Sequence, residues 1–300
     1  MLSLYVAIKL LWRARHFDVI VLDGGPIGRW FTLLAGLVPV CPVPVVMIDC
    51  LWYVDANPFK QSIKRRLLQF SARSVNCFVV WAFHEIEDYS KAFRIPCEKF
   101  AYLPFHTTIE SYEFQVSDQG YIFAGGNGDR DYAILIEAVR GTDLPVFIAA
   151  TDENLFAGIA IPDNVTVRGV SHDEFRKKMA GCSFAVVPMR GGLLHSGGQQ
   201  TFLNSMAMGK ATIIVGRKAA EGYVEDGVSG IVVENGNVSA LREAILCLAN
   251  DQVLRMRLAM AGKAIAASLS TDVFVRKLYG IASTFAKKRS TSVANKGGRI

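Results

Sequence analysis

The sequence of 300 residues predicts an α/β protein made of two units, each built on a parallel sheet. Short runs of β-branched or aromatic residues alternate with helical patterns almost from end to end, which is typical of parallel strands joined by crossover helices. The composition, 51% hydrophobic and 20% charged, provides enough apolar surface for large cores. It excludes a disordered, collagen-like or coiled-coil chain.

The first half of the chain contains four candidate strands, each a short β-branched or aromatic run. They lie at 17–22, 43–48, 75–80 and 100–103. Helical patterns cover 2–15, 57–73 and 84–93. The uncharged stretch 30–48 is long enough to span a membrane, but three prolines divide it. We interpret it as a short helix, a loop and a buried strand, with a membrane span as the alternative.

The second half contains six candidate strands and five clear helical patterns. The strands lie at 120–124, 145–149, 165–168, 183–187, 211–215 and 230–233, and the helices at 131–140, 172–180, 199–208, 238–250 and 252–267. The apolar pattern lapses over 107–119, so we expect a boundary there. The expected domains are 1–112 and 113–270, followed by a carboxyl-terminal helix over 271–286 and a basic, disordered tail over 287–300.

Charge and cysteine content narrow the range of partners. Lys and Arg outnumber Asp and Glu by 33 to 27, and the pI near 9.0 favours anionic partners such as phosphates or lipid headgroups. The basic residues lack interleaved aromatics on a recognised module, so nucleic acid is not expected. The six cysteines form no CxxC pair and no acidic metal motif is visible. We therefore expect no metal, no cofactor and a reducing, cytoplasmic location.

A glycine-rich turn follows the strand expected at 120–124 and precedes a helix. It contains Gly125, Gly126 and Asn127, with Arg130 close behind. Glycines at such a turn let the backbone approach a ligand, and the amides at the helix start attract an anion such as phosphate. The spacing is neither a dinucleotide fingerprint nor a Walker loop. A tight turn without a ligand, and a solvated Arg130, remain alternatives.

A second glycine-rich loop leads from the strand at 183–187 into the helix that opens at Gln199. Ligands of open parallel sheets bind at the carboxyl ends of strands, where helix amides point at them. We therefore interpret this loop, which includes Gly197 and Gly198, as a diphosphate cradle, with a surface loop that binds no ligand as the alternative. His195 precedes these glycines and is the histidine best placed to touch a donor sugar. Asp49 follows another strand, and either it or Asp55 would position an acceptor hydroxyl.

The pattern QQTFLNSMAMGKATIIVG, followed by EGYVEDGVSGIVVENGN, resembles the carboxyl-terminal domain of the family-4 retaining glycosyltransferases. Their GT-B fold has two Rossmann-like domains that face each other across a cleft. The resemblance covers most of 118–285, and 1–117 match only loosely, as a short acceptor-side domain.

The resemblance implies transfer of a sugar from a nucleotide-diphosphate sugar, with retention, to a glycan or lipid-linked acceptor in polysaccharide or glycoconjugate biosynthesis. The amides of Gly197, Gly198, Gln199 and Gln200 would meet the donor's sugar and diphosphate. Arg130 would supply a phosphate contact, and Val170 and His172 would lie near the base. A hexosyltransferase is expected.

Two features depart from the family pattern. The family usually has two glutamates separated by seven residues, and Ser196 and Asn204 stand at those positions. Asn204 can hydrogen-bond a ribose hydroxyl, but neither residue carries a negative charge. The amino-terminal domain also lacks the family's opening strand and acceptor loop, so we expect either a short form or a start inside a longer reading frame. The alternative function is a non-catalytic nucleotide-sugar-binding subunit that supports a partner enzyme.

The helix expected at 57–73 is basic and amphipathic. Phe59, Ile63, Leu67 and Phe70 form one stripe, and the helix carries five Lys and Arg but no acid. Such a helix can lie on an anionic membrane, where lipid-linked acceptors are found. The alternative is a helix that packs its stripe on the sheet. Together with the apolar 2–12 segment, this favours peripheral contact with the inner face of the membrane.

Overall fold

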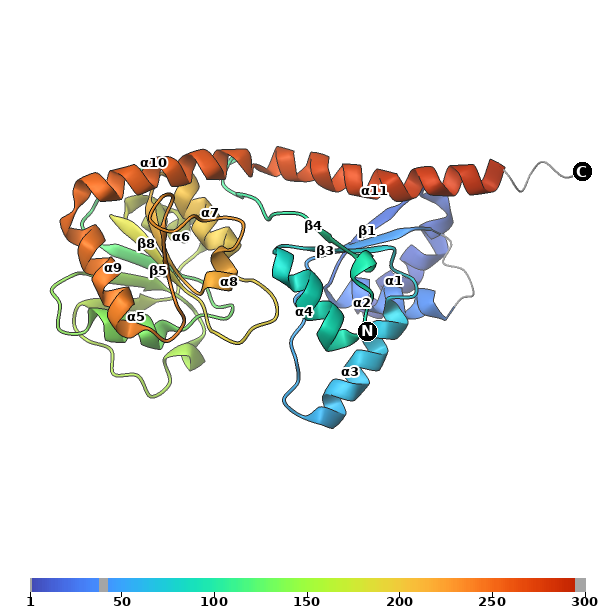
Figure 1. Ribbon diagram of the computed structural model, residues 1–300, viewed down its shortest axis with the longest axis horizontal. Coiled ribbons are helices and arrows are strands. Elements are labelled where there is room, and N and C mark those ends of the chain that lie inside the picture. Colours follow the sequence, from blue (N-terminus) through green and yellow to red (C-terminus); the bar gives the residue numbers. More distant parts are fainter. Residues whose placement is uncertain (1, 38–42, 295–300) are drawn as a thin grey trace, which may run out of the picture. The chain divides into compact units, whose positions relative to one another are not determined.

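The computed structural model describes residues 2–37 and 43–294, and their side chains up to residue 286. The chain divides into two compact units (Figure 1). Unit 1 comprises residues 1–104 and 274–300, and unit 2 comprises residues 105–273. The units therefore divide at 104/105 and not at the expected 112/113, and most of the carboxyl-terminal helix belongs to unit 1.

Unit 1 is built on four parallel strands that lie side by side in chain order. They are β1 (Ile20–Asp23), β2 (Val45–Ile48), β3 (Cys77–Val80) and β4 (Phe100–Tyr102). The crossover helices are α2 (Pro26–Gly36), α3 (Pro58–Ser71) and α4 (Phe83–Phe93), and α1 (Leu2–Arg13) packs on α2. Because parallel crossovers are right-handed, this strand order places the three crossover helices on one face of the sheet.

An aromatic cluster forms the core beside the carboxyl end of β2. The ring of Trp52 lies 5.0 Å from the rings of Phe78 and Tyr89 and 5.3 Å from that of Phe93. The hydroxyl of Tyr89 donates to the carbonyl of Cys50 at 2.8 Å. These contacts fix the chain where it leaves β2.

The apolar stripe of α3 does not pack on the sheet. Asn57 caps the helix by accepting from the N–H groups of Phe59 and Lys60. Phe59, Ile63 and Leu67 are 73%, 45% and 50% exposed. The structure therefore contradicts the alternative in which this stripe is buried, although Phe70 is half-buried.

Unit 2 contains a six-stranded parallel sheet with the order β10-β9-β8-β5-β6-β7. The strands are β5 (Ile122–Gly125), β6 (Val146–Ala149), β7 (Val165–Arg168), β8 (Phe184–Pro188), β9 (Ala211–Val215) and β10 (Ile231–Val233). The helices are α5 (Tyr132–Val139), α6 (His172–Gly181), α7 (Gln199–Ala207), α8 (Arg217–Ala220), α9 (Val238–Asn250) and α10 (Gln252–Ser268).

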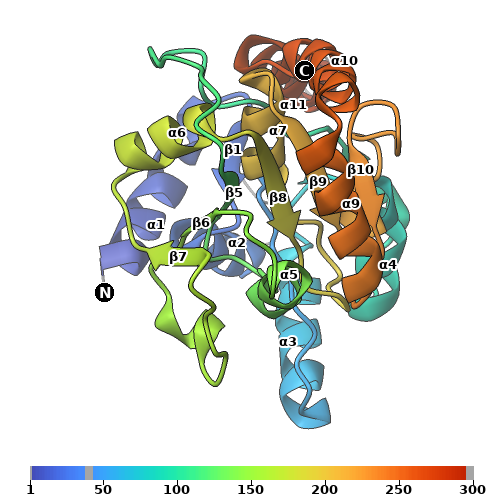
Figure 2. The same cartoon turned by 90° about the vertical axis from the view of Figure 1, so that its left-hand side faces the viewer.

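Helices cover both faces of this sheet (Figure 2). Ile122 and Ala124 of β5 share a buried cluster with residues of α5 and α9, whereas Phe123 between them packs against the side of α6. This alternation is what a strand buried on both faces requires. The predicted fold class, α/β with parallel sheets, is confirmed.

Most predicted elements occur within a few residues of their expected bounds. The uncharged stretch 30–48 is divided between α2 and β2, as interpreted, with 38–42 outside the described residues. The tail expected to be disordered from 287 is helical up to Ala294, because α11 runs from Thr271 to Ala294, and 295–300 lie outside the described residues.

Among the described residues, one stretch, 252–286, has the length and mean hydropathy of a membrane span, and 28% of its most apolar 18 residues are buried. It consists of α10 and the first part of α11, which are separate helices.

Candidate functional site

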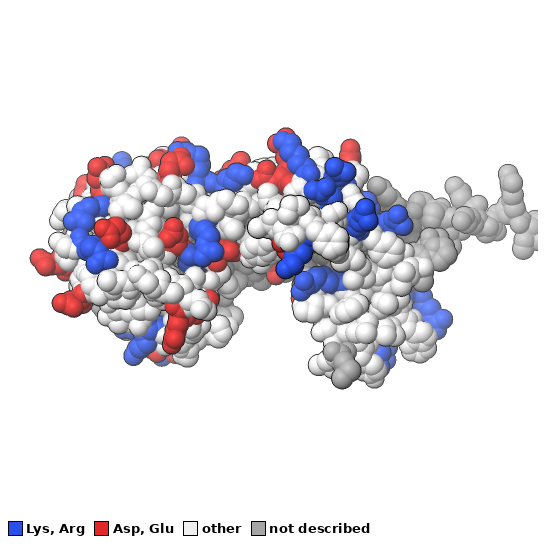
Figure 3. All heavy atoms as spheres, turned by 90° about the horizontal axis from the view of Figure 1, so that it is seen from below, with Lys and Arg blue, Asp and Glu red and all other residues white. Residues whose placement is uncertain are grey.

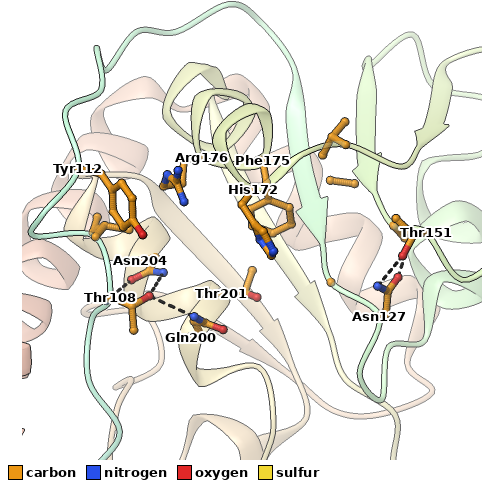
Figure 4. A pocket seen from close by; sticks show the side chains of 15 residues that line it. Thr108, Tyr112, Asn127, Thr151, His172, Phe175, Arg176, Gln200, Thr201 and Asn204 are labelled. Carbon is orange, nitrogen blue, oxygen red and sulfur yellow. Dashed lines mark hydrogen bonds between the residues drawn. The ribbon is translucent and has the colours of Figure 1, made fainter.

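The strand order of unit 2 reverses between β5 and β8, which lie side by side. Ligands of open α/β sheets bind outside the carboxyl ends of the strands at such a switch point. A cavity of about 790 Å³ lies there, between the turn after β5, the strand ends of β6 and β7, and the start of α7 (Figure 4). Its lining residues are Thr108, Ile109, Tyr112, Gly126, Asn127, Ala149, Ala150, Thr151, Val170, His172, Phe175, Arg176, Gln200, Thr201 and Asn204. We call this cavity the switch-point pocket.

The turn after β5 forms one wall of the pocket. Gly126 has a φ of +105°, a conformation that favours glycine, and its N–H donates to the carbonyl of Ala149 at 3.0 Å. Asn127 joins this turn to the end of β6: its Nδ2 donates to the Thr151 hydroxyl at 2.8 Å, and its Oδ1 accepts the N–H of Thr151 at 2.8 Å. The wall is therefore preorganised by its own hydrogen bonds.

Arg130 lies beneath this turn and not on the surface of the pocket. It is 5% exposed, and its guanidinium donates to the carbonyls of Gly125 and Gly128 at 3.1 and 2.8 Å and to the Thr201 hydroxyl at 3.0 Å. Burial lowers the pKa of Arg130. The sequence marked Arg130 as either a phosphate contact or a solvated charge, and the structure excludes the solvated charge. In this structure Arg130 ties the turn after β5 to the first turn of α7.

The start of α7 is held tightly. Gly198 has a φ of +82°, and a Cβ there would lie 2.8 Å from Met189 Sδ and 2.9 Å from Val187 Cγ1. The N–H groups of Thr201 and Phe202 donate to the Gly198 carbonyl. The N–H groups that precede Thr201 belong to the first turn of the helix, and N–H groups in that position have no carbonyl acceptor within the helix. Gln200 is exposed and lines the pocket, so the helix start reaches it through Gln200.

Gln199 is buried next to this exposed helix start. It is 5% exposed, and its Nε2 has no hydrogen-bond partner among the residues that the structure describes. Gln199 does not line the switch-point pocket.

The candidate catalytic residues His195 and Ser196 line a second, smaller cavity of about 50 Å³ together with Gly197. Nε2 of His195 lies 3.0 Å from Oδ2 of Asp129, and the histidine side chain is 2% exposed. Asp129 has a φ of +54°, and its carbonyl accepts the N–H of Arg190 at 2.8 Å. The pair of His195 and Asp129 therefore joins the loop before α7 to the turn after β5. Asp129 was not among the residues predicted from the sequence.

Asn204 faces the segment that leads into unit 2. Its Oδ1 accepts the N–H of Thr108 at 2.8 Å, and its Nδ2 donates to the Thr108 hydroxyl at 2.9 Å. Nε2 of Gln200 donates to the same hydroxyl at 3.2 Å. The segment around Thr108, which was predicted only as a boundary, thus forms an edge of the pocket.

A cation and an aromatic ring meet at the edge of the pocket. The guanidinium carbon of Arg176 lies 3.7 Å from the ring centroid of Tyr112. Phe175 packs edge-on against Phe123, 5.1 Å between centroids, which sets α6 against the sheet. His172 is the first residue of α6, and Ser171 caps this helix by accepting the N–H of Glu174. Cationic and aromatic groups at a cavity edge suit a nucleotide.

Asp49 lies in unit 1, at the carboxyl end of β2, and is exposed. Its φ is +55°, and a Cβ at Gly24 would lie 2.5 Å from its carbonyl oxygen. A non-glycine residue held in this conformation stores strain, which is often found at functional sites.

The predicted donor-binding residues thus fall into three groups. Six of them line the switch-point pocket: Gly126, Asn127, Val170, His172, Gln200 and Asn204. Gly197 lines the smaller cavity, and Gly125, Arg130, Gly198 and Gln199 line neither. Sequence reasoning missed Thr151, although it follows a strand end in the same way as Gly126. It also missed Arg176, one helical turn beyond His172.

Comparison with known proteins agrees with this geometry. Residues 134–251 match the family model described as "Glycosyl transferases group 1". An uncharacterized glycosyltransferase of Methanocaldococcus jannaschii is 31% identical over 159 residues, which are 49% of this chain and 43% of that protein. The chain thus matches less than half the length of this curated relative.

Solved structures share the fold. A sucrose-phosphate synthase of Thermosynechococcus elongatus matches with a TM-score of 0.72 and 14% identity over 97% of this chain and 78% of its own. Anabaena HepE in complex with UDP matches with a TM-score of 0.66 and 15% identity over 97% and 82%. A glycosyltransferase of Rickettsia africae matches with a TM-score of 0.67 and 13% identity over 95% and 80%. The fold is therefore that of the GT-B glycosyltransferases, and residues 134–251 match the group 1 glycosyltransferase family.

Proposed function

We propose that the protein is a glycosyltransferase that moves a sugar from a nucleotide-diphosphate sugar to a glycan or lipid-linked acceptor. The observation that carries this proposal is the switch-point pocket, in which a glycine turn and the first turn of α7 meet at the reversal of strand order. The match of residues 134–251 to group 1 glycosyltransferases supports the reaction class. The UDP and UDP-glucose complexes of Anabaena HepE, which shares the fold, support the donor class.

In this proposal the donor's diphosphate lies at the start of α7. Its oxygens accept hydrogen bonds from the helix amides around Gln199 and Gln200, which stabilise the negative charge of the leaving nucleotide. The buried Arg130 adds a fixed positive charge behind them. The base lies near Val170 and His172. Group transfer then breaks the bond between the anomeric carbon and the diphosphate and forms one to an acceptor hydroxyl, with retention of configuration as the family resemblance implies.

Asp49 is assigned to the acceptor, and Ser196 and His195 to the donor sugar. A carboxylate near the sugar would stabilise the positive charge that develops at the anomeric carbon. Ser196 has no such charge, so the proposal gives it a hydrogen-bonding role. His195 is held by Asp129 and would keep one fixed orientation.

The surface of unit 1 supports the proposed lipid-linked acceptor. Among the residues whose side chains the structure describes, unit 1 carries 14 Lys and Arg and 8 Asp and Glu, whereas unit 2 carries 14 and 19. Among the charged side chains on the face of unit 1 seen in Figure 3, basic ones predominate over acidic ones. The exposed apolar stripe of α3 lies among Lys60, Lys64 and Arg66. This combination favours binding to an anionic membrane surface, and we propose peripheral association at its cytoplasmic face.

A second candidate function is a nucleotide-sugar-binding subunit without turnover. It is favoured by one observation: none of the described residues that line the switch-point pocket is Asp or Glu. In addition, Ser196 and Asn204 stand where the family usually has glutamates.

One experiment separates the two functions. The purified chain is incubated with a panel of UDP-, GDP-, ADP- and dTDP-sugars together with membrane extract, while the melting temperature and the release of nucleoside diphosphate are measured. A ligand that prefers the native state raises its melting temperature. Stabilisation with release supports the transferase, and stabilisation without release supports the binding subunit. If no compound raises the melting temperature, both proposals are wrong.

A further inference from the structure

Asn204 is engaged inside the protein on both atoms of its side-chain amide. Its oxygen accepts the Thr108 N–H at 2.8 Å and its nitrogen donates to the Thr108 hydroxyl at 2.9 Å. The residue is 8% exposed. In Figure 4 it points toward Thr108, beneath Tyr112. These two bonds hold the segment around Thr108 against the second turn of α7.

Two more neutral acceptors of the switch-point pocket already accept hydrogen bonds, whereas Oε1 of Gln200 and the hydroxyl of Tyr112 face the pocket as neutral acceptors. Oδ1 of Asn127 accepts the N–H groups of Thr151 and Asp152 at 2.8 and 3.1 Å. The Thr201 hydroxyl accepts from Arg130 at 3.0 Å. No carboxylate is present among the described lining residues. A ribose diol is commonly held by a carboxylate, which accepts hydrogen bonds from its hydroxyls. This pocket has no such acceptor.

Among the described residues, the same lining contains one cation, Arg176, and several hydrogen-bond donors. Arg176 and His172 both face the cavity, and Gln200 lies at the helix start (Figure 4). Guanidinium, imidazole and helix amides match phosphate oxygens, which are acceptors only. The pocket can therefore recognise a nucleotide by its phosphates and base, while the sugar hydroxyls meet only neutral acceptors among the described lining residues, which discriminate less than a carboxylate does.

We infer that Asn204 is a positioning residue for the Thr108 segment and that the pocket binds 2′-deoxyribonucleoside diphosphates as well as ribonucleoside diphosphates. The inference rests on the proposed function, because it takes this pocket as the nucleotide site. It widens the donor class to sugars activated on deoxyribonucleotides.

The test compares matched nucleotides on the full chain. Affinities for UDP and dUDP, ADP and dADP, GDP and dGDP, and CDP and dCDP are measured by isothermal titration calorimetry, and the pair that binds most tightly decides. We expect its two members to differ by less than about fivefold, whereas a charged acceptor on the 2′-hydroxyl separates them by about tenfold or more. A preference of fivefold or more for the ribonucleotide overturns the inference.

Variants test the role of Asn204. Asn204→Ala should weaken both members of the pair by the same factor, about tenfold, because it removes both bonds to Thr108. Thr108→Ala keeps the main-chain N–H and should give a smaller loss of the same kind. Asn250→Ala, at the exposed end of α9, is the matched control and should change neither affinity.

The remaining outcomes are equally decisive. If Asn204→Ala weakens only the ribonucleotide, Asn204 reads the ribose and the inference is wrong. If it changes neither affinity, Asn204 does not position the pocket edge. If this variant does not fold, the ratio measured on the unmodified chain decides. If none of the eight nucleotides binds the unmodified chain, it is the proposed function that fails.

Discussion

Replacing Gly198 with Ala tests whether the glycine loop holds the start of α7 as tightly as the structure implies. Gly198 has a φ of +82°, and an added Cβ would lie within 3.0 Å of both Met189 Sδ and Val187 Cγ1. The left-handed conformation costs a non-glycine residue about 1–2 kcal/mol. Inserting a methyl group into a packed site costs about 1–3 kcal/mol. We therefore expect Gly198→Ala to lower the free energy of unfolding by about 2–5 kcal/mol.

Gly236→Ala is the matched control for this change. Its φ is +77°, but no heavy atom of the described residues lies within 4 Å of an added Cβ, so only the conformational cost of about 1–2 kcal/mol applies. All four tryptophans, Trp12, Trp30, Trp52 and Trp81, lie in unit 1, so their fluorescence follows that unit, while far-UV circular dichroism follows both.

Thermal unfolding is followed by both signals. For a unit of this size 1 kcal/mol corresponds to about 2–4 °C in melting temperature. Gly198→Ala should therefore melt several degrees below Gly236→Ala in the dichroism signal. If the two variants melt at the same temperature, Gly198 does not pack against β8 as described.

Three further outcomes are expected. Thr201→Val removes the acceptor of Nη2 of the buried Arg130, at 3.0 Å, and should cost about 1–3 kcal/mol in urea unfolding; an unchanged midpoint would mean that this hydrogen bond does not stabilise the fold. Phe59→Ser should weaken binding to vesicles containing anionic lipid by about tenfold or more, since burying a phenylalanine contributes roughly 1.5–3 kcal/mol. Ile161→Ser, at an exposed site of unit 2, is the control, and equal losses in both would refute a membrane role for α3. Burial raises the pKa of Asp118, but hydrogen bonds from Ser183 and Gly120 outweigh it and hold this pKa below its usual range. The ionised Asp118 therefore stabilises the folded state above about pH 4, and this stabilisation is lost as the pH falls through the lowered pKa of the folded state. The melting temperature of Asp118→Asn should therefore fall less than that of the unmodified chain between about pH 5 and 2.

The strands were the most predictable part of the molecule, because burial on both faces leaves a continuous apolar run. All five residues of β9 are buried, and its bounds match the expectation. β1 was expected to begin at 17 but begins at Ile20. It lies at an edge of the sheet, where Val21 is 40% exposed, so its sequence pattern constrains its bounds less.

The site was predictable where a residue follows a strand end or belongs to the motif that resembles the glycosyltransferases. Gly126 and Val170 follow strand ends, Gln200 and Asn204 belong to the motif, and all four line the pocket. Thr108 and Tyr112 fit neither case, because they belong to a segment without apolar periodicity, and tertiary contacts alone bring them to the pocket. Arg130 was predicted as a ligand contact from its place beside a glycine turn. Sequence spacing cannot reveal that its guanidinium is directed inward to Gly125 and Thr201.

The most direct test of the proposed donor site is a hydrogen–deuterium exchange footprint of the full chain with the nucleoside diphosphate that stabilises it most. We expect slower exchange at 125–128, 170–172 and 199–204, with no change at the exposed start of α9. Protection confined to other segments, with none at the start of α7, would contradict the assignment of the switch-point pocket to the donor nucleotide.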